Sequence, residues 1–365
     1  MRIIFAGGGT GGHLYPGLAI ARALVRSDSR VQPFFIGAQR GIEREVLPGT
    51  EFPHLLLDLH PLYRTRVWQN WRTIRGGITA WGEIGRVMRG SGARLVVGTG
   101  GYAAGLVLAY AATHRLPYVL QEQNSHAGLT MRTFSRWARQ IYLGFPEAAR
   151  LMSRGAATAI VDTGNPIEPP PSPRPDRTVA REKWGFSSTG GRVLLIVGGS
   201  QGARGLNQVV AAWLRKGAPD GWQIIWATGR GSHAEYARFE SDRVRVRPYL
   251  SPISDAYAAT DLALCRSGAM TTAELCAWAI PSILVPLPTA AADHQTANAR
   301  ALEAAGAAIF LPQRELTPDR IDVILGTLRL DRGELYRLAE AAAVRGRPDA
   351  AEQIARRILT LLRTR

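Results

Sequence analysis

Short runs of apolar residues alternate along the chain with longer segments whose apolar positions recur at helical spacing. Residues 2–6 form one such run, and residues 14–25 form the helical segment that follows it. Residues 193–197 and 206–214 repeat this order in the second half of the chain. Apolar runs this short, separated by helices, are typical of buried parallel strands. The pattern therefore predicts an α/β protein in which each half begins its own doubly wound parallel sheet.

Six further apolar runs are predicted to be strands: residues 34–37, 95–98, 118–120, 224–227, 262–265 and 283–286. Residues 164–176 (GNPIEPPPSPRPD) divide these runs and contain six prolines, which neither a helix interior nor a central strand tolerates. We therefore expect a first domain over residues 1–163, a proline-rich linker over 164–190 and a second domain over 191–345.

The composition narrows the class of protein. A chain of 365 residues is long enough to bury two cores. The uncharged stretch 101–113 is shorter than the roughly 18–20 residues that cross a bilayer, and Met1 leads straight into a predicted strand, so we expect neither a membrane span nor a signal peptide. Cys265 and Cys276 are the only cysteines, without metal-ligand spacing, and we expect two free thiols.

The formal net charge of +16 comes almost wholly from arginine, because Lys183 and Lys216 are the only lysines. Such a surface can attract nucleic acid, anionic lipid or a phosphorylated substrate. The sequence contains no recognisable nucleic-acid-binding motif, and we expect no nucleic-acid partner.

Three glycine-rich turns follow predicted strands, at residues 7–12, 98–102 and 198–202. Gly7, Gly9 and Gly12 match the dinucleotide-binding fingerprint, whose glycines let a pyrophosphate approach backbone N–H groups. A nicotinamide enzyme should also have an acid at the end of its second strand. Here no Asp or Glu occurs from the start of that strand at residue 34 until Glu43. This disfavours a dehydrogenase. One tight turn needs no ligand, but three of them favour a cleft between two domains whose backbone approaches sugar and phosphate.

Seven motifs occur in order that together resemble glycosyltransferase family 28, the bacterial N-acetylglucosaminyltransferases of peptidoglycan synthesis. They are GGGTGGHLYPG (7–17), VVGTGGYAAG (96–105), QEQNSHAGLT (121–130), TGNP (163–166), GGSQGARGLN (198–207), CRSGAMTTAEL (265–275) and ADHQTANAR (292–300). The resemblance implies a GT-B fold, with two Rossmann-like domains facing a central cleft and a C-terminal helix, within residues 346–365, that returns to the first domain.

The resemblance also implies an activity. N-acetylglucosamine would pass with inversion from UDP-N-acetylglucosamine to the C4 hydroxyl of the muramyl sugar of lipid I, giving lipid II. The acceptor would lie on the first domain and the donor mainly on the second. No cofactor is implied, and the enzyme would act peripherally at the cytoplasmic face of the bacterial inner membrane. A related GT-B enzyme with another lipid or small-molecule acceptor is the alternative.

His13 is the candidate general base, because it lies in a glycine loop at a helix start, where it can meet the acceptor hydroxyl. Two other roles stay open: His13 contacts the acceptor without taking its proton, or it caps the loop. Glu122 is the rival carboxylate, although residues 121–124 could equally form a hydrogen-bond network at the sheet end. The resemblance implies that Gly100, Gly101, Tyr102 and Asn124 contact the acceptor.

The donor-binding candidates lie on both domains. On the first domain they are Thr10, Gly11, Gly12 and Asn124, and on the second Ser200, Gln201, Gly202, Leu250, Arg266, Glu274, His294 and Gln295. Glu274 could accept both ribose hydroxyls, but Thr271 and Glu274 also fit a capping box. No carboxylate pair stands at a strand end to hold a metal ion against the diphosphate, and we expect no metal site.

One position departs from the family pattern. Relatives usually have an arginine facing the diphosphate two residues after the GNP motif, where this chain has Glu168. Either another cation, such as Arg204 or Arg266, replaces it, or Glu168 turns away. Two smaller departures are Gln121, often histidine in relatives, and Leu106, usually proline.

The segment 60–95 has an apolar stripe at helical spacing, flanked by arginines. The stripe is Trp68, Trp71, Ile74, Ile78, Trp81, Ile84 and Met88, and the arginines include Arg64, Arg66, Arg72, Arg75, Arg86, Arg89 and Arg94. The stripe could pack on the sheet, or part of it could enter the headgroup region of an anionic membrane. Gly76 and Gly77 could interrupt the helix.

Overall fold

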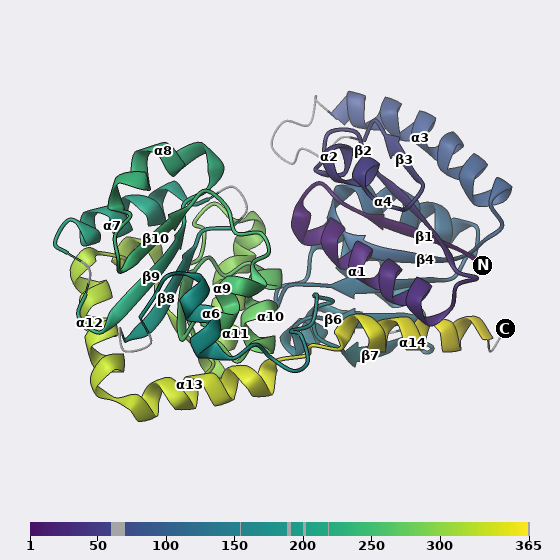
Figure 1. Cartoon of the computed structure of the whole chain (residues 1–365). Helices are drawn as coiled ribbons and strands as arrows, with labels where there is room; N and C mark the ends of the chain where they lie inside the picture. The colour runs from purple at the N-terminus through teal and green to yellow at the C-terminus, as the bar shows by residue number, and fades with distance from the viewer. Residues whose placement is uncertain (60–69, 154, 188–190, 200–201, 218, 364–365) are drawn as a thin grey trace. The chain divides into compact units, whose positions relative to one another are not determined.

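The computed structural model describes residues 1–59, 70–153, 155–187, 191–199, 202–217 and 219–363. The chain divides into two compact units (Figure 1): the first comprises Met1–Glu168 and Asp349–Arg365, and the second Pro169–Pro348. The first unit thus continues past the predicted boundary at residue 163. The α/β fold class predicted from the hydrophobic pattern is confirmed by two parallel sheets, one in each unit.

The first unit contains a seven-stranded parallel sheet in the order β3-β2-β1-β4-β5-β6-β7. Its strands are β1 (Arg2–Gly7), β2 (Gln32–Ala38), β3 (His54–Leu57), β4 (Ala93–Gly100), β5 (Tyr118–Glu122), β6 (Gln140–Leu143) and β7 (Ala159–Asp162). Its helices are α1 (Gly11–Ser27), α2 (Glu43–Val46), α3 (Asn70–Gly90), α4 (Gly101–Thr113), α5 (Leu129–Phe134) and α14 (Ala350–Arg363).

The alternation of side chains along β1 builds a core on each face of this sheet. Ile3 and Phe5 pack with α1 and α14, whereas Ile4 and Ala6 pack with α3 and α4. Because both faces are covered, the strand reads as a continuous apolar run rather than an alternating one. Parallel strands joined by helices bring their carboxyl ends to one edge of the sheet, where ligands bind in such folds.

The C-terminal helix α14 belongs to the first unit and packs on α1, as Figure 1 shows for the yellow and purple helices. Ile354 and Ile358 are completely buried, and each such side chain contributes roughly 1.5–3 kcal/mol on burial. Arg26 of α1 also bonds Glu352 at 2.7 Å. The end of the chain therefore stabilises the helix that begins at the first glycine turn.

The second unit contains a six-stranded parallel sheet in the order β10-β9-β8-β11-β12-β13. Its strands are β8 (Arg192–Val197), β9 (Trp222–Ala227), β10 (Val244–Arg247), β11 (Leu262–Cys265), β12 (Ser282–Leu284) and β13 (Ala308–Phe310). Its helices are α6 (Arg177–Lys183), α7 (Arg204–Leu214), α8 (His233–Tyr236), α9 (Ser254–Ala259), α10 (Ala269–Ala277), α11 (His294–Ala304), α12 (Pro318–Leu330) and α13 (Arg332–Arg345).

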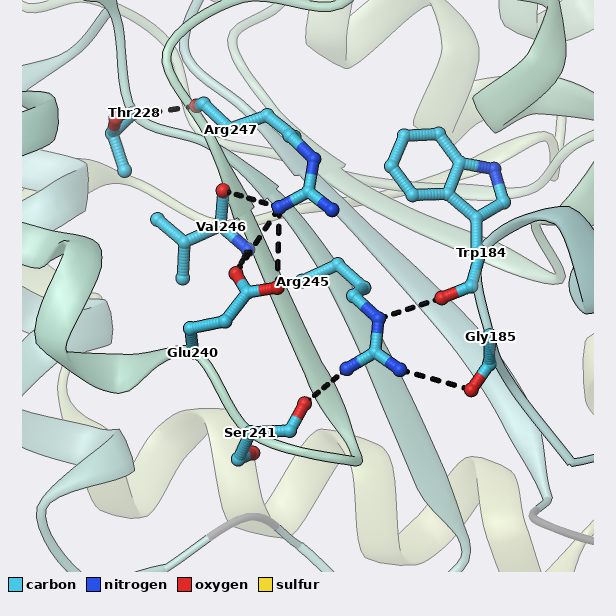
Figure 2. A network of polar contacts seen from close by, with 8 residues as sticks. All are labelled: Trp184, Gly185, Thr228, Glu240, Ser241, Arg245, Val246 and Arg247. Atoms are coloured by element: carbon cyan, nitrogen blue, oxygen red, sulfur yellow. Dashed lines mark hydrogen bonds and ion pairs between the residues drawn. The ribbon is translucent and has the colours of Figure 1, made fainter.

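The edge strand β10 is covered by a polar network, shown in Figure 2. The Arg245 guanidinium donates to the carbonyl oxygens of Trp184 and Gly185, just beyond α6, at 2.6 and 2.9 Å, and also to the carbonyl of Ser241. Arg247 bonds the Glu240 carboxylate, which accepts the Val246 N–H at 2.6 Å. The bond to Glu240 occupies the Val246 N–H, a backbone group of the edge strand that would otherwise be open to another chain.

All the predicted strands are present, and Cys265 and Cys276 are buried free thiols. The helix α3 runs through Gly76 and Gly77 without a break, so the suggestion that these glycines interrupt the helix is wrong. The second unit also begins with α6, inside the segment predicted as linker. Arg181 of α6 pairs with Asp261 and thereby fixes this helix to the second sheet.

Candidate active site

Protein atoms fill the space beside the first glycines of the loop after β1. A Cβ would lie 1.8 Å from Thr99 Oγ1 if added to Gly7, 1.7 Å from Glu43 Oε1 on Gly8, and 2.8 Å from Tyr102 Cε1 on Gly9. The expectation that these glycines admit sugar and diphosphate is therefore wrong for these three. The exposed Gly12 has more room, since the nearest described atom, Thr10 Oγ1, would lie 3.8 Å from its Cβ.

His13 lies in the first turn of α1, half-buried. Its Nδ1 is 3.0 Å from Thr10 Oγ1, and its carbonyl oxygen accepts a 2.7 Å hydrogen bond from the Thr99 hydroxyl. The imidazole lies over Gly100, where an added Cβ would be 2.8 Å from His13 Cδ2 and 3.2 Å from Nε2. Both the backbone and the ring of His13 are thus fixed by neighbouring groups.

The second glycine turn packs directly on the first. The Gly8 N–H donates to the Gly100 carbonyl at 3.3 Å, and a Cβ on Gly101 would lie 2.0 Å from the Gly8 oxygen. Gly101 also has a φ of 77°, a conformation that glycine adopts without strain. These contacts gather the candidates Thr10, Gly11, Gly12, His13, Gly100, Gly101 and Tyr102 at one edge of the first sheet.

Glu122 ends β5 and its carboxylate anchors the loop that follows. Oε1 accepts from the Asn124 N–H at 2.9 Å and its amide at 3.3 Å, while Oε2 accepts from the Gly128 N–H at 2.9 Å. Burial raises the pKa of Glu122, and these N–H bonds partly oppose that rise. The predicted hydrogen-bond network at this sheet end is therefore present. Thr130, just beyond the loop, donates to the Gly101 carbonyl at 3.2 Å and links it to the glycine turns.

A buried amide cluster extends the predicted network of residues 121–124 to Asn165, which the sequence analysis did not include. Gln121 Nε2 donates to Asn165 Oδ1 at 3.1 Å, and Asn165 Nδ2 donates to the Gln123 carbonyl at 3.0 Å. Gln123 Nε2 in turn donates to the Thr99 carbonyl at 2.8 Å. The signal in the sequence was the GNP motif, whose asparagine follows a strand end. The cluster joins that motif to the strand that bonds His13.

Glu168, the departure from the family pattern, lies near α1. Its side chain is exposed, and its charge helps to raise the pKa of Arg22, whose larger cause is the hydrogen bond to Glu51. The carboxylate therefore lies within electrostatic reach of α1.

The glycine loop after β8 is described in part, and Ser200 and Gln201 lie outside the described residues. Gly202 has a φ of 77°, and a Cβ there would lie 2.4 Å from the Thr228 carbonyl. The buried Asn207 donates to that carbonyl at 2.7 Å and accepts from Trp226 Nε1 at 3.1 Å. Asn207, which the sequence reasoning missed, thus fixes the start of α7, where Arg204 is exposed.

Glu274 is held by a buried tyrosine rather than by a capping box. α10 begins at Ala269 with Gly268 as its N-cap, so Thr271 lies inside the helix and the capping-box alternative is wrong. The Tyr257 hydroxyl donates to Glu274 Oε2 at 2.7 Å. Burial and, less strongly, the Glu274 charge raise the pKa of Tyr257 well above its usual value, so the hydroxyl keeps its proton.

Arg266 is committed to internal contacts. Its Nη1 donates to the carbonyls of Val285 and Pro286 at 3.1 and 3.0 Å, and Nη2 donates to Gln313 Oε1 at 2.6 Å. The side chain is 7% exposed, and burial lowers the pKa of the guanidinium. These contacts indicate that Arg266 supports the loop after β12 and does not replace the family cation.

The loop before α11 combines strained backbone with the candidates His294 and Gln295. Ala292 and Asp293 have φ values of 50° and 53°, a conformation that costs a non-glycine residue roughly 1–3 kcal/mol. His294 Nδ1 lies 2.6 Å from the Ala291 carbonyl, and Gln295 Oε1 accepts from the Leu287 N–H at 2.9 Å. Strain of this kind is commonest at ligand sites.

Leu250 lies in the loop after β10, beside an exposed aromatic side chain. The Leu250 side chain is 7% exposed, whereas Tyr249 is 46% exposed and lies under the Arg230 guanidinium, 5.3 Å from its ring centroid. The structure therefore places this donor-binding candidate next to an accessible aromatic ring.

The apolar stripe on α3 is partly buried. Ile84 and Met88 lie in the core, Trp81 packs against it, and Ile78 is 73% exposed. Trp68, Arg64 and Arg66 lie outside the described residues, as do the side chains of Trp71, Arg72, Ile74 and Arg75. Within the described ranges, no helix is long and apolar enough to cross a membrane, and no cluster of three or more His, Cys, Asp or Glu side chains could bind a metal ion.

Two family models match the chain. The glycosyltransferase family 28 N-terminal domain matches residues 3–143, and the family 28 C-terminal domain matches residues 193–354. These matches cover the three glycine-rich turns and all the candidate residues of the second unit.

Named relatives match over nearly the full length. A Moorella thermoacetica protein named UDP-N-acetylglucosamine--N-acetylmuramyl-(pentapeptide) pyrophosphoryl-undecaprenol N-acetylglucosamine transferase is 38% identical over 98% of each chain. A Porphyromonas gingivalis protein of the same name is 36% identical over 97% of this chain and 94% of its own. Among solved structures, Acinetobacter baumannii MurG aligns with a TM-score of 0.77 and 27% identity over 98% of this chain and 99% of its own. The calicheamicin glycosyltransferase CalG4, 15% identical with a TM-score of 0.66, shares the fold over 98% of each chain.

Proposed function

The chain belongs to glycosyltransferase family 28, and on that premise we propose that it transfers N-acetylglucosamine from UDP-N-acetylglucosamine to the C4 hydroxyl of the muramyl sugar of lipid I. The product is lipid II, the disaccharide precursor of peptidoglycan. The observation that carries this proposal is the 38% identity to a transferase of that name over 98% of both chains.

His13 acts as the general base in this proposal. To accept a proton on Nε2, the imidazole must carry its other proton on Nδ1, and the Thr10 hydroxyl 3.0 Å away can accept a hydrogen bond from it. Nε2 takes the proton of the C4 hydroxyl as the oxygen attacks the anomeric carbon. The bond from that carbon to the UDP oxygen breaks, the configuration inverts, and UDP leaves with the electron pair. Gly100, Gly101, Tyr102 and Asn124 line the acceptor side, and Glu122 positions Asn124 instead of taking the proton.

The second unit binds the nucleotide. The Glu274 carboxylate accepts hydrogen bonds from the ribose hydroxyls, and the backbone of Leu250 contacts the uracil. His294 and Gln295 face the sugar hydroxyls. The diphosphate meets the backbone of Ser200, Gln201 and Gly202 at the start of α7, where the helix dipole and Arg204 favour negative charge. Thr10, Gly11 and Gly12 contact the donor from the first unit.

The acceptor is lipid-linked, so we propose that the enzyme binds the cytoplasmic face of the bacterial inner membrane peripherally. Anionic lipid attracts basic residues at about 1 kcal/mol each near the surface. Exposed Ile78 and the exposed Arg86, Arg89 and Arg94 supply such a surface. Co-sedimentation with anionic but not neutral vesicles, weakened by salt, is expected. Binding that ignores both lipid charge and salt would contradict this part of the proposal.

The decisive experiment offers labelled UDP-N-acetylglucosamine with a lipid I analogue. Formation of the labelled disaccharide supports the proposal. Transfer to a diacylglycerol or a small aglycone, with none to the lipid I analogue, would favour the alternative acceptor class.

A further inference from the structure

Glu43 is a fully buried carboxylate beneath the first glycine loop. Both of its oxygens accept the Gly9 N–H, each at 2.9 Å, and Oε1 also accepts the Ala38 N–H at 3.1 Å. The side chain is 0% exposed. A buried carboxylate is costly unless it is hydrogen-bonded, and here backbone donors on two separate segments supply the bonds.

Three glycines make room for this carboxylate. A Cβ would lie 1.7 Å from Glu43 Oε1 on Gly8, 2.8 Å from Glu43 Cγ on Gly37, and 2.0 Å from Glu43 Oε2 on Gly41. The three come from the loop after β1, from β2 and from the turn before α2. Several parts of the fold are therefore shaped around a single side chain.

This contact reaches His13 through a short path. Gly9 precedes Thr10, the N-cap of α1, and Thr10 Oγ1 lies 3.0 Å from His13 Nδ1. The loop has no side chain of its own at Gly7, Gly8 or Gly9 to fix its conformation. The carboxylate supplies the hydrogen bonds that orient Gly9, and so the geometry of Thr10 and His13 depends on it.

We propose that Glu43 is a positioning residue, a built-in anion that holds the glycine loop so that Thr10 and His13 meet the acceptor hydroxyl. This inference rests on the proposed transferase function. It also explains why a sequence with the dinucleotide fingerprint need not bind a dinucleotide. The Gly9 N–H that would face a pyrophosphate is taken by Glu43, whose own charge repels phosphate from that part of the loop.

The test compares Glu43→Ala and Glu43→Gln with the wild type and with the matched control Glu45→Ala, an exposed glutamate two residues away. The assay measures kcat and KM for transfer of labelled sugar to a lipid I analogue, alongside UDP affinity by titration. We expect kcat to fall roughly 10²-fold in Glu43→Ala, because small misplacements of catalytic groups cost about that much. The UDP affinity of Glu43→Ala should equal that of the wild type. The control Glu45→Ala should keep the wild-type kcat, KM and UDP affinity. Glu43→Gln keeps one oxygen acceptor and should fall between.

Acetate provides a readout that a general loss of stability would not move. The alanine substitution removes two carbon atoms and two oxygen atoms, which acetate replaces, so sodium acetate should raise kcat of Glu43→Ala above its value in sodium chloride of equal ionic strength. The wild type and Glu43→Gln should not respond.

Three outcomes would overturn the inference: kcat of Glu43→Ala within threefold of the wild type, UDP affinity falling in parallel with kcat, or no difference between acetate and chloride. If Glu43→Ala does not fold, a kcat of Glu43→Gln equal to that of the wild type would by itself overturn the inference. An inactive wild type would instead refute the proposed transferase function, so the two failures are distinguishable.

Discussion

Both units contain a central strand followed by a glycine turn and a helix, yet the charged side chain that follows the adjacent strand has the opposite sign in the two units. In the first unit, β1 leads through Gly7–Gly9 to α1, and the adjacent strand β2 is followed by Glu43, which takes the Gly9 N–H. In the second unit, β8 leads through Gly198–Gly202 to α7, and the adjacent strand β9 is followed by Arg230.

The space beside single glycines also differs between the turns, although Gly198 and Gly202 in the second turn are closely packed as well. In the first turn, atoms of Glu43 and Thr99 lie where a Cβ on Gly8 or Gly7 would be. In the second turn, no described atom lies within 4 Å of a Cβ on Gly199, and Arg204 is exposed at the first position of α7. The comparison teaches that one glycine pattern can serve two purposes. The first turn positions a histidine, and we propose that the second receives the diphosphate.

The largest expected effect is that of removing the histidine. His13→Ala should lower turnover roughly 10²–10⁴-fold, the usual contribution of a general base, and leave UDP affinity unchanged, because the base acts on the acceptor. Steady-state kinetics and UDP titration measure the two effects, with His114→Gln, at the exposed end of α4, as the control. Turnover within a few-fold of the wild type would refute the assignment of His13 as base.

Matched alanine substitutions test the packing around the two turns. At Gly101, where φ is 77°, the alanine Cβ would lie 2.0 Å from the Gly8 carbonyl oxygen. At Gly199, where φ is 93°, no described atom would lie within 4 Å of the alanine Cβ. The backbone conformation alone costs roughly 1–3 kcal/mol in each case, and overlap adds about as much again in the first. Gly101→Ala should therefore unfold at distinctly lower denaturant concentration. Equal midpoints would show that the first turn is not closely packed.

Donor affinity should depend on Glu274. Glu274→Ala removes charged hydrogen bonds to the ribose, each worth roughly 1.5–3 kcal/mol, and UDP affinity should fall about 10–100-fold. The His13→Ala variant serves as the reciprocal control. An unchanged dissociation constant for UDP in Glu274→Ala would show that Glu274 does not bind the ribose.

The smallest effect is expected from the residue that holds Glu274. Tyr257→Phe deletes only the hydroxyl that donates to Oε2, a bond worth roughly 0.5–1.5 kcal/mol net, or somewhat more because its partner is charged. UDP affinity should fall several-fold, and the preference for UDP over its 2′-deoxy analogue should narrow. A stability loss without any change in this preference would assign Tyr257 a purely structural role.

The hydrophobic pattern predicted the central strands of both sheets because these are continuous apolar runs buried on both faces. The glycine turns were visible for the same reason, since they follow those runs directly. The pattern missed β3, β6, β7, β10 and β13, which lie at or next to sheet edges and are shorter or less buried. Glu43 was seen only as an acid too distant to bind a ribose. Its contact with Gly9 arises when α2 returns beneath the first turn, and no local pattern encodes that return. Gly37 and Gly41 on either side of the strand end were the available signal.

The errors in the predicted site have similar causes. The capping box failed because the spacing of Thr271 and Glu274 carries no information about where α10 starts, and the strand end at Cys265 with Gly268 as N-cap sets that start. Arg266 was a plausible cation for the diphosphate by position. Its burial against carbonyls of the neighbouring strand end depends on the order of strands in the sheet.

Amide hydrogen exchange with and without UDP tests the central contrast between the turns most directly. UDP should slow exchange over residues 198–207 and 266–274 more than over residues 7–13, because the diphosphate is expected at the second turn and the Gly9 N–H is already bonded to Glu43. Protection of residues 7–13 that equals or exceeds that of residues 198–207 would contradict the account.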